Sequence, residues 1–487
     1  MLFNSWGYLL FMLLLVPAQR LVPERARVPL LAAGSLGFYA MWRWEFCSLL
    51  ILSSAIDYLC ASKIHASEDD SARKRWLALS LTLNLGLLVV FKYTYFLYDN
   101  VSAVAGLAGA TLPDAHDLGL NIVLPLGISF YTFQTISYTI DIYRRVAEPT
   151  PTFAGFLAYV SYWPQLIAGP ILRAGEVLPQ LLKRQPFRWS DVGVGTELVL
   201  RGLFKKVVIA DRIAPLVDAA FALDASRMNA IDVWVATFLF GFQIYLDFAG
   251  YSDIAIGSAR IMGLRFPDNF NWPYLSRSPR EFWKRWHISL SSWIRDYLYL
   301  PLSGAQFRTQ SRGGLEIEEP KAAKNSPNRA LFLTWFIMGL WHGAGWNFAI
   351  WGVYHAVIIY AYRRLKWLEQ LTQRFPLLGW ATVLMASMAA WIPFRAVSVK
   401  QTVTMFGKLI NPMAYTLSGR TVAGHAYLAV AVLMVAMLAA AAIDRKLPVW
   451  TQKPLARTVA VATSSALVTV SVLIWLKTVR QFIYFQF

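Results

Sequence analysis

Three of the six histidines lie within apolar sequence, where an imidazole could take up or release a proton. His342 stands in the stretch GLWHGAGWN, inside the uncharged run Ala330–Tyr362. An ionisable side chain at membrane depth is costly and marks a functional site by default. Histidine titrates near neutral pH and often serves as a general base, and Gly343 and Gly345 reduce the bulk beside it for a substrate or another backbone. We therefore predict that His342 is a general base.

His287 is the second candidate, in the stretch WHISLSSW. Its neighbours Lys284 and Arg285 would favour a neutral imidazole, which is the form that a proton acceptor needs. We expect His287 to orient an acceptor hydroxyl or to stabilise a developing oxyanion. His355 follows His342 by 13 residues and need not share its helical face, so we predict a packing role for it.

The residues around these histidines do not form a metal-binding pattern. The run that contains His342 offers no carboxylate or thiol to complete a ligand set. The two cysteines, Cys47 and Cys60, lie in apolar surroundings and are predicted to be packed thiols, not a disulfide framework. The pattern favours a base that acts without a metal on a hydroxyl or a thioester.

The elements that position these residues are predicted to be membrane helices. The chain is 57% hydrophobic and 15% charged, whereas about 25% is usual in soluble proteins. Uncharged runs approach or exceed the roughly 20 residues that cross hydrocarbon, and only helices satisfy the backbone there in continuous apolar runs. The expected fold is an all-α polytopic membrane protein with about 10–13 transmembrane or re-entrant helices. The longer runs are Met1–Gln19, Leu118–Ile140, Phe153–Leu172, Ala330–Tyr362, Phe375–Phe394, Thr421–Ile443 and Thr458–Leu476, and the shorter ones are Val28–Trp42, Phe46–Ile56, Trp76–Phe91 and Val233–Leu246.

Charge sets the expected topology. The net charge is +18, and basic residues cluster at the ends of the apolar runs, as the positive-inside rule requires of cytoplasmic segments. Such clusters include residues 20–27 and 183–188, whereas no Lys or Arg lies between Tyr93 and Tyr143. We therefore place the Asp99–Gly119 loop outside the cell. Met1–Gln19, which lacks a basic leader and a cleavage site, is expected to remain as a first span.

Two further segments are expected to depart from simple spans. Phe153–Leu172 has basic residues on both sides and contains Pro164 and Pro170, which predicts a re-entrant segment whose residues 162–171 line a cavity open to the cytoplasm; a kinked plain span is the alternative. Asp247–Leu302 mixes charges with tryptophans and is predicted to form interfacial amphipathic helices, with Trp286 and Trp293 on one face. Residues 303–328 are predicted to form a flexible surface loop.

Several motifs resemble those of the membrane-bound O-acyltransferase family. EFWKRWHISL at residues 281–290, followed by RDYLY at 295–299, is similar to the central motif of the family, and GLWHGA at 339–344 is similar to its catalytic motif. Further stretches resemble the alginate O-acetyltransferase-like branch: FKY at 91–93, PLGISFYTFQ at 125–134, PQLIAGP at 164–170, YLDFAGYSD at 245–253 and WIPFRA at 391–396. The motifs run in order through nearly the whole chain. Residues 303–328 depart from the pattern, being longer and more acidic.

This resemblance implies a ring of helices around a central tunnel. Residues 1–487 would form one membrane domain, with N-terminal helices in 1–145, a catalytic core in 146–395 and C-terminal helices in 396–487. His342 corresponds to the near-invariant histidine of the family and His287 to its second polar active-site residue. The residues expected to contact substrate are Gln165, Trp286, Trp341, Asn347, Arg295 and Asp296. Gln165 would shape the donor entrance, while Arg295 and Asp296 are expected to pair with each other and not to react.

The implied function is O-acetylation in the bacterial inner membrane. Acetyl-CoA would be the cytoplasmic donor, and hydroxyls of an exported polysaccharide would receive the group, directly or through a periplasmic acetyltransferase partner. Direct transfer and an acyl-histidine intermediate both fit the sequence. No permanently bound cofactor, metal or nucleic acid is expected, and lipid is the surrounding partner. Two alternatives are D-alanyl transfer from a carrier protein to teichoic acid, and a non-catalytic transporter of acyl groups or polymer.

Overall fold

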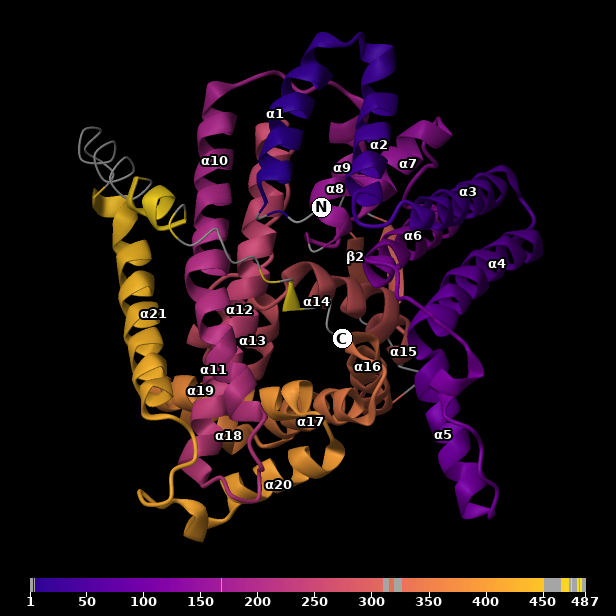
Figure 1. Ribbon diagram of the computed structural model, residues 1–487. Helices are drawn as coiled ribbons and strands as arrows, with labels where there is room; N and C mark the ends of the chain where they lie inside the picture. Colours follow the sequence, from indigo (N-terminus) through magenta and orange to yellow (C-terminus); the bar gives the residue numbers. More distant parts are fainter. Residues whose placement is uncertain are drawn as a thin grey trace.

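The computed structural model is a helical assembly in which one long helix and several short ones occupy the middle and other helices surround them (Figure 1). It describes residues 3, 5–167, 169–309, 315–318, 326–450, 466–472, 474, 480 and 482–483. The α-helices are α1 Trp6–Leu21, α2 Glu24–Ala40, α3 Glu45–Ala66, α4 Asp70–Leu88, α5 Thr94–Leu107, α6 Ile128–Tyr143, α7 Phe153–Ser161, α8 Trp163–Leu166, α9 Ala174–Leu182, α10 Trp189–Leu203, α11 Asp211–Phe221, α12 Ala230–Ile261, α13 Pro279–Arg285, α14 Ile288–Ile294, α15 Leu300–Ser303, α16 Pro327–His342, α17 Trp346–Arg364, α18 Lys366–Arg374, α19 Pro376–Arg395, α20 Val399–Ile410 and α21 Gly424–Trp450. Single π-helical turns are η1 Val89–Tyr93, η3 Phe204–Ala210 and η5 Arg295–Tyr299, and 3₁₀ turns are η2 Ala115–Leu118, η4 Pro273–Leu275 and η6 Pro412–Ala414.

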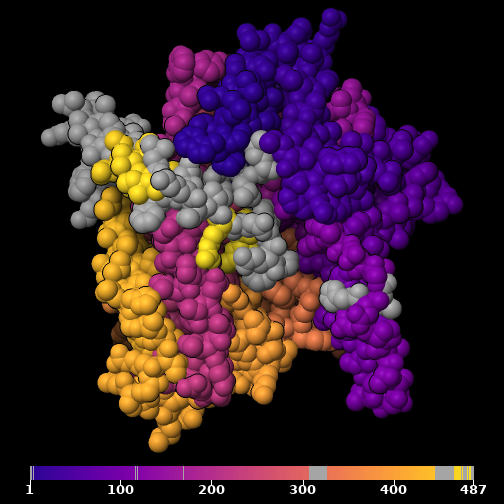
Figure 2. Space-filling model, in the orientation of Figure 1, coloured from indigo at the N-terminus to yellow at the C-terminus, as the bar shows by residue number. Residues whose placement is uncertain are grey.

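Five helices in the described part of the chain are long and apolar enough to cross a membrane: Glu45–Ala66, Asp70–Leu107, Ala230–Ile261, Pro376–Arg395 and Gly424–Asp444. Burial separates them into central and peripheral helices. In α12, 83% of the most apolar window is buried, against 17% in α4–α5 and in α21. The peripheral helices expose apolar side chains around the body, and the tip of α5 protrudes from it (Figure 2). The chain is therefore a multi-pass membrane protein built around α12.

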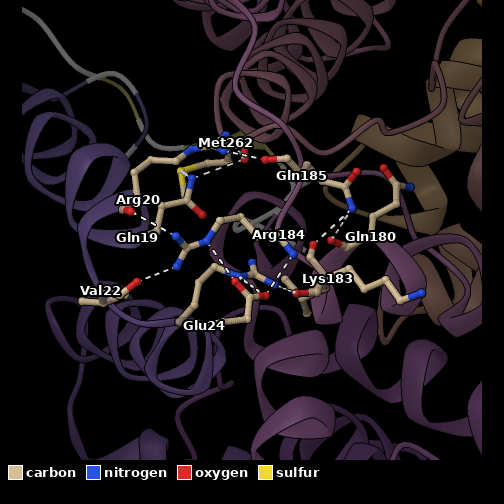
Figure 3. Close-up of polar contacts among 11 residues, drawn as sticks. Gln19, Arg20, Val22, Glu24, Gln180, Lys183, Arg184, Gln185 and Met262 are labelled. Carbon is tan, nitrogen blue, oxygen red and sulfur yellow. Dashed lines mark hydrogen bonds and ion pairs between the residues drawn. The ribbon is translucent and has the colours of Figure 1, made fainter.

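The turn between α1 and α2 lies at the opposite end of the molecule from the tip of α5 (Figure 1). At this turn the two basic clusters that the sequence places on one side meet (Figure 3). Arg20 donates to the carbonyl of Gln185 at 2.6 Å, and Arg184 pairs with Glu24 at 2.9 Å. The two basic segments that the positive-inside rule places on the same side of the membrane, residues 20–27 and 183–188, are therefore also neighbours in space.

Helix α12 corrects the expectation that Asp247–Leu302 consists of interfacial helices. It continues without a break to Ile261 because its carboxylates are neutralised by cations from the preceding helical segment. Lys206 lies 2.5 Å from Asp247, and Lys205 lies 2.6 Å from Asp253. Close packing supports the same arrangement, since a Cβ on Gly202 would lie 2.5 Å from the carbonyl oxygen of Gly250. The pairing makes burial of a charged helix possible.

Other expected elements are shorter than predicted. Trp286 and Trp293 do not share a helix: Trp286 caps the end of α13, and Trp293 belongs to α14. The run Leu118–Ile140 becomes helical only from Ile128, after Pro125 and a left-handed Gly127. Within residues 303–328, Gln306–Thr309 (β1) and Leu315–Glu318 (β2) form an antiparallel pair, where a loop was expected. The rest of that predicted loop, residues 310–314 and 319–325, and most of Thr458–Leu476 lie outside the described residues.

The segment 153–172 is interrupted, as its prolines predict. Helix α7 ends before Tyr162, whose ψ of 111° leaves the helical region, and the single turn α8 follows. Tyr159, Tyr162 and Gln165 are fully buried there. The interruption therefore lies inside the protein, where irregular backbone is tolerated.

Candidate active site

His342 is the last residue of α16, and not part of a continuous span. The run Ala330–Tyr362 divides here because Gly343 is extended and α17 begins at Trp346. Glycines bring α17 back against α16: a Cβ on Gly352 would lie 2.0 Å from the carbonyl oxygen of Trp335. A Cβ added at Gly343 would lie 2.1 Å from the ring of Phe348, so the missing side chain of this glycine makes room for Phe348 of α17.

The imidazole of His342 is buried among aromatic rings. Its centroid lies 4.8 Å from those of Trp341 and Trp351 and 5.3 Å from that of Phe394. The last turn of α16 is held from another part of the chain. Lys92, in the π-helical turn η1, donates to the carbonyls of Trp341 and His342.

Tyr93 completes this cap by donating to the carbonyl of Leu340 at 2.9 Å. The final carbonyls of a helix lack partners within it and carry partial negative charge. Lys92 and Tyr93 satisfy three of them and so fix where His342 stands. The sequence showed these residues only as part of the FKY motif; the signal that could have drawn attention to Lys92 is a lone cation next to the apolar run 76–91.

His287 lies between two seven-residue helices, α13 and α14, and is fully buried. Its backbone is left-handed, with φ 40° and ψ 58°, which is unfavourable for a residue with a Cβ, and strained backbone of this kind is enriched at functional sites. Burial lowers the pKa of His287 to about 3, so the imidazole is neutral. Desolvation, not the adjacent cations Lys284 and Arg285, therefore causes the neutral state that the sequence predicts.

Asn269 organises the surroundings of His287. Its Oδ1 lies 3.2 Å from Nδ1 of His287 and accepts hydrogen bonds from the backbone N–H and the hydroxyl of Ser289 at 3.3 and 2.9 Å. Its Nδ2 donates to the hydroxyl of Ser252 at 3.1 Å. Asn269 is not among the predicted site residues; the signal for it in the sequence is an amide inside the aromatic stretch NFNW.

The two histidines belong to one aromatic cluster. Phe130, from α6, lies 6.3 Å from His287 and 6.1 Å from Trp341, measured between ring centroids. Phe133, on the same helix, stacks on Trp341 at 4.9 Å and on Trp293 at 3.9 Å. Helices α6, α14 and α16 thus bring His287 and the neighbour of His342 to the same ring, although the segments lie far apart in the sequence.

Two glutamines are buried with polar atoms that lack partners among the described residues. Gln165, a predicted site residue, donates to the carbonyl of Tyr159, and its buried Oε1 has no partner in the described part of the chain. Gln134, on α6, is 1% exposed, and neither its Oε1 nor its Nε2 has a partner among the residues described. Buried polar groups are nearly always paired, so such atoms are candidates to contact substrate.

The other predicted site residues are held in internal contacts. Arg295 pairs with Asp296 at 2.6 Å, as expected, and Arg173 also bonds Asp296. The amide of Asn347 bonds the carbonyl of Ala396 at 2.9 Å and the hydroxyl of Thr402 at 3.1 Å. These contacts leave the substrate-binding roles of Arg295, Asp296 and Asn347 as predictions.

Trp286 and His355 are both enclosed by aromatic rings. Trp286 packs 5.0 Å from Trp391 and 5.2 Å from Phe270. His355 lies 4.9 Å from Trp283 and 4.8 Å from Trp351, and it lines a small pocket. The described residues include no group of three or more His, Cys, Asp or Glu side chains placed to hold a metal ion.

Comparison with known proteins agrees with this architecture. Residues 143–315 match the model of the MBOAT, membrane-bound O-acyltransferase, family. A "Probable alginate O-acetylase" of Azotobacter vinelandii is 36% identical over 438 residues, which cover 90% of this chain and 83% of the relative. A peptidoglycan O-acetyltransferase of Helicobacter pylori is 33% identical over 78% of this chain and 73% of its own length. A teichoic acid D-alanyltransferase of Bacillus subtilis is 28% identical over 56% of this chain and 67% of its own length. The chain therefore belongs to the membrane-bound O-acyltransferase family and is an O-acyltransferase.

Proposed function

We propose that this protein moves an acetyl group from cytoplasmic acetyl-CoA toward hydroxyls of an exported polysaccharide, directly or through a periplasmic partner, in the bacterial inner membrane. The observation that carries the proposal is the placement of His342 and His287 in one buried aromatic cluster, each held by polar groups from distant segments. The similarity to the alginate and peptidoglycan enzymes supports the choice of acetyl group and glycan.

In the proposed reaction His342 takes the proton of the attacking hydroxyl. The hydroxyl oxygen forms a bond to the thioester carbonyl carbon, the C–S bond breaks, and the departing thiolate takes up the proton from His342. A positioned general base contributes about 10²–10⁴-fold to the rate. His287 orients the hydroxyl, and Gln165 lies at the donor entrance.

The test compares His342→Ala with His355→Ala in protein reconstituted with lipid and acetyl-CoA. His355 is a matched control because both imidazoles are 5% exposed and both contact Trp351. His342→Ala is expected to lose acetyl transfer by about 10²–10⁴-fold, with His355→Ala much closer to the wild-type rate. Near wild-type transfer by His342→Ala contradicts the assignment.

D-alanyl transfer to teichoic acid is the second candidate, favoured by the likeness to the Bacillus subtilis enzyme. An acidic carrier protein would dock on the basic cluster around Arg20 and Arg184. Turnover that requires an aminoacylated carrier and fails with acetyl-CoA favours this candidate. A non-catalytic transporter would tolerate replacement of both histidines.

A further inference from the structure

The hydrogen bonds around Asn269 determine which nitrogen of His287 carries its proton. A backbone N–H can only donate, and the N–H of Ser289 points at the side-chain oxygen of Asn269 at 3.3 Å. That oxygen must therefore be the amide carbonyl, because an NH₂ group there would face another donor. Its partner Nδ1 of His287, 3.2 Å away, must then be protonated, since two bare lone pairs would repel.

The second nitrogen of His287 is left as an acceptor. A neutral imidazole carries one proton, so Nε2 has a bare lone pair when Nδ1 is protonated. Nε2 is buried and has no hydrogen-bond partner within the described ranges. An unpaired buried acceptor of this kind costs stability, and the left-handed backbone at His287 adds strain at the same residue. The unpaired acceptor and the backbone strain therefore both fall on His287, in the same aromatic cluster as His342.

Asn269 also holds the backbone on which His287 stands. The backbone carbonyl of Asn269 accepts a hydrogen bond from the backbone N–H of Ile288 at 2.9 Å, and Ile288 directly follows the strained His287. The hydroxyl of Ser289, which donates to Asn269, in turn accepts from the N–H of Ile171, at the end of the interrupted segment 153–172. Helix α14, which follows directly after His287, lies in the middle of the molecule (Figure 1).

We infer that Asn269 is a positioning residue that holds His287 as the Nδ1-protonated tautomer, so that Nε2 accepts a hydrogen bond from a second hydroxyl of the polysaccharide, next to the attacking one. The inference rests on the proposed function and decides between the two roles expected of His287. In this tautomer Nε2 cannot donate to an oxyanion, so His287 orients the acceptor through the neighbouring hydroxyl, while His342 takes the proton of the attacking one.

The direct test is nitrogen NMR of the full-length protein, ¹⁵N-labelled at histidine in lipid nanodiscs, with His287 assigned by comparison with His287→Gln. The wild type is expected to show a proton on Nδ1 and none on Nε2. Asn269→Leu, which removes the acceptor, is expected to lose this tautomer. Asn269→Asp, which keeps an oxygen at the same place, is expected to retain it. Asn84→Leu serves as the control, because Asn84 is also buried but bonds Asp57 in a separate cluster.

Kinetics provide the second measurement. Asn269→Leu is expected to lower kcat by about 10²-fold, the loss that misplacement of a group that orients the substrate can cause, with KM for the acyl donor little changed and partial rescue by Asn269→Asp. A wild-type His287 protonated on Nε2, or an Asn269→Leu variant that keeps the Nδ1 proton or the full kcat, overturns the inference. The tautomer is measured without turnover. Wild-type protein with the expected tautomer but no acetyl transfer would therefore refute the proposed function alone.

Discussion

Gln134 offers a test that separates substrate contact from structural support. It is 1% exposed, and both ends of its amide lack partners among the described residues. It follows Phe130 by four residues, which places the two side chains on one face of α6, and Phe130 contacts the ring of His287. We predict that Gln134→Leu makes the protein more stable and less active.

The expected gain in stability follows from desolvation. Protein mutational data assign about 1–3 kcal/mol to burial of an unpaired amide. Leucine has a comparable shape and removes this cost, so the free energy of unfolding should rise by about 1–3 kcal/mol. Activity should fall because the substrate loses both a donor and an acceptor, and a lost hydrogen bond of this kind is worth about 0.5–1.5 kcal/mol.

The assay measures reversible unfolding in mixed detergent micelles beside acetyl transfer in vesicles. Gln19→Leu is the matched control, since Gln19 is 2% exposed but its Nε2 donates to the carbonyl of Met262 at 3.3 Å. That replacement breaks a satisfied contact and should destabilise the protein by about 0.5–1.5 kcal/mol without the catalytic loss. A Gln134→Leu variant that is less stable than wild type, or fully active, refutes the reasoning.

Three further predictions concern the placement and charge of the histidines. Lys92→Met removes the cap on α16 and should reduce kcat more than Arg73→Met does. Arg73 is the control because it is a buried cation that caps carbonyls of α3 and α6, away from the site. Equal losses of kcat per folded molecule would contradict a positioning role for Lys92. Gly352→Ala should destabilise the protein by about 1–3 kcal/mol through overpacking of α17 on α16 and should reduce activity. Gly407→Ala, where a Cβ meets open space, should do neither. Unfolding and activity measurements on both variants test this prediction. Because the pKa of His287 falls from 6.5 to about 3, the unfolded chain binds the extra proton and stability falls as pH drops below 6.5. Replacement by Gln should flatten this slope by up to about 1.4 kcal/mol per pH unit, and an unchanged slope contradicts a buried neutral imidazole.

Much of the architecture could be predicted from local sequence. Hydropathy located the helices because the cost of exposing a backbone to lipid applies to each segment separately. The uncharged run around His342 and the interruption near Pro164 followed from the same reasoning, and His342 and the interruption are both buried. The positive-inside rule assigned the basic clusters to one side of the membrane, and the structure adds that two of them, at residues 20–27 and 183–188, contact each other.

What the sequence by itself determined, therefore, was the class of protein and the approximate positions of its helices, and it supplied the two histidines as candidates for the site. Only the tertiary structure decided that α12 continues through Asp247, because its neutralising partner Lys206 comes from another helix. It also decided that Lys92, 250 residues from His342, caps the helix on which that histidine stands. The orientation of the Asn269 amide could not be predicted from the sequence either, because it depends on the backbone N–H of Ser289 in α14. Helix formation depends on nearby residues, whereas the proton on an imidazole depends on which distant atoms the fold brings within hydrogen-bonding distance.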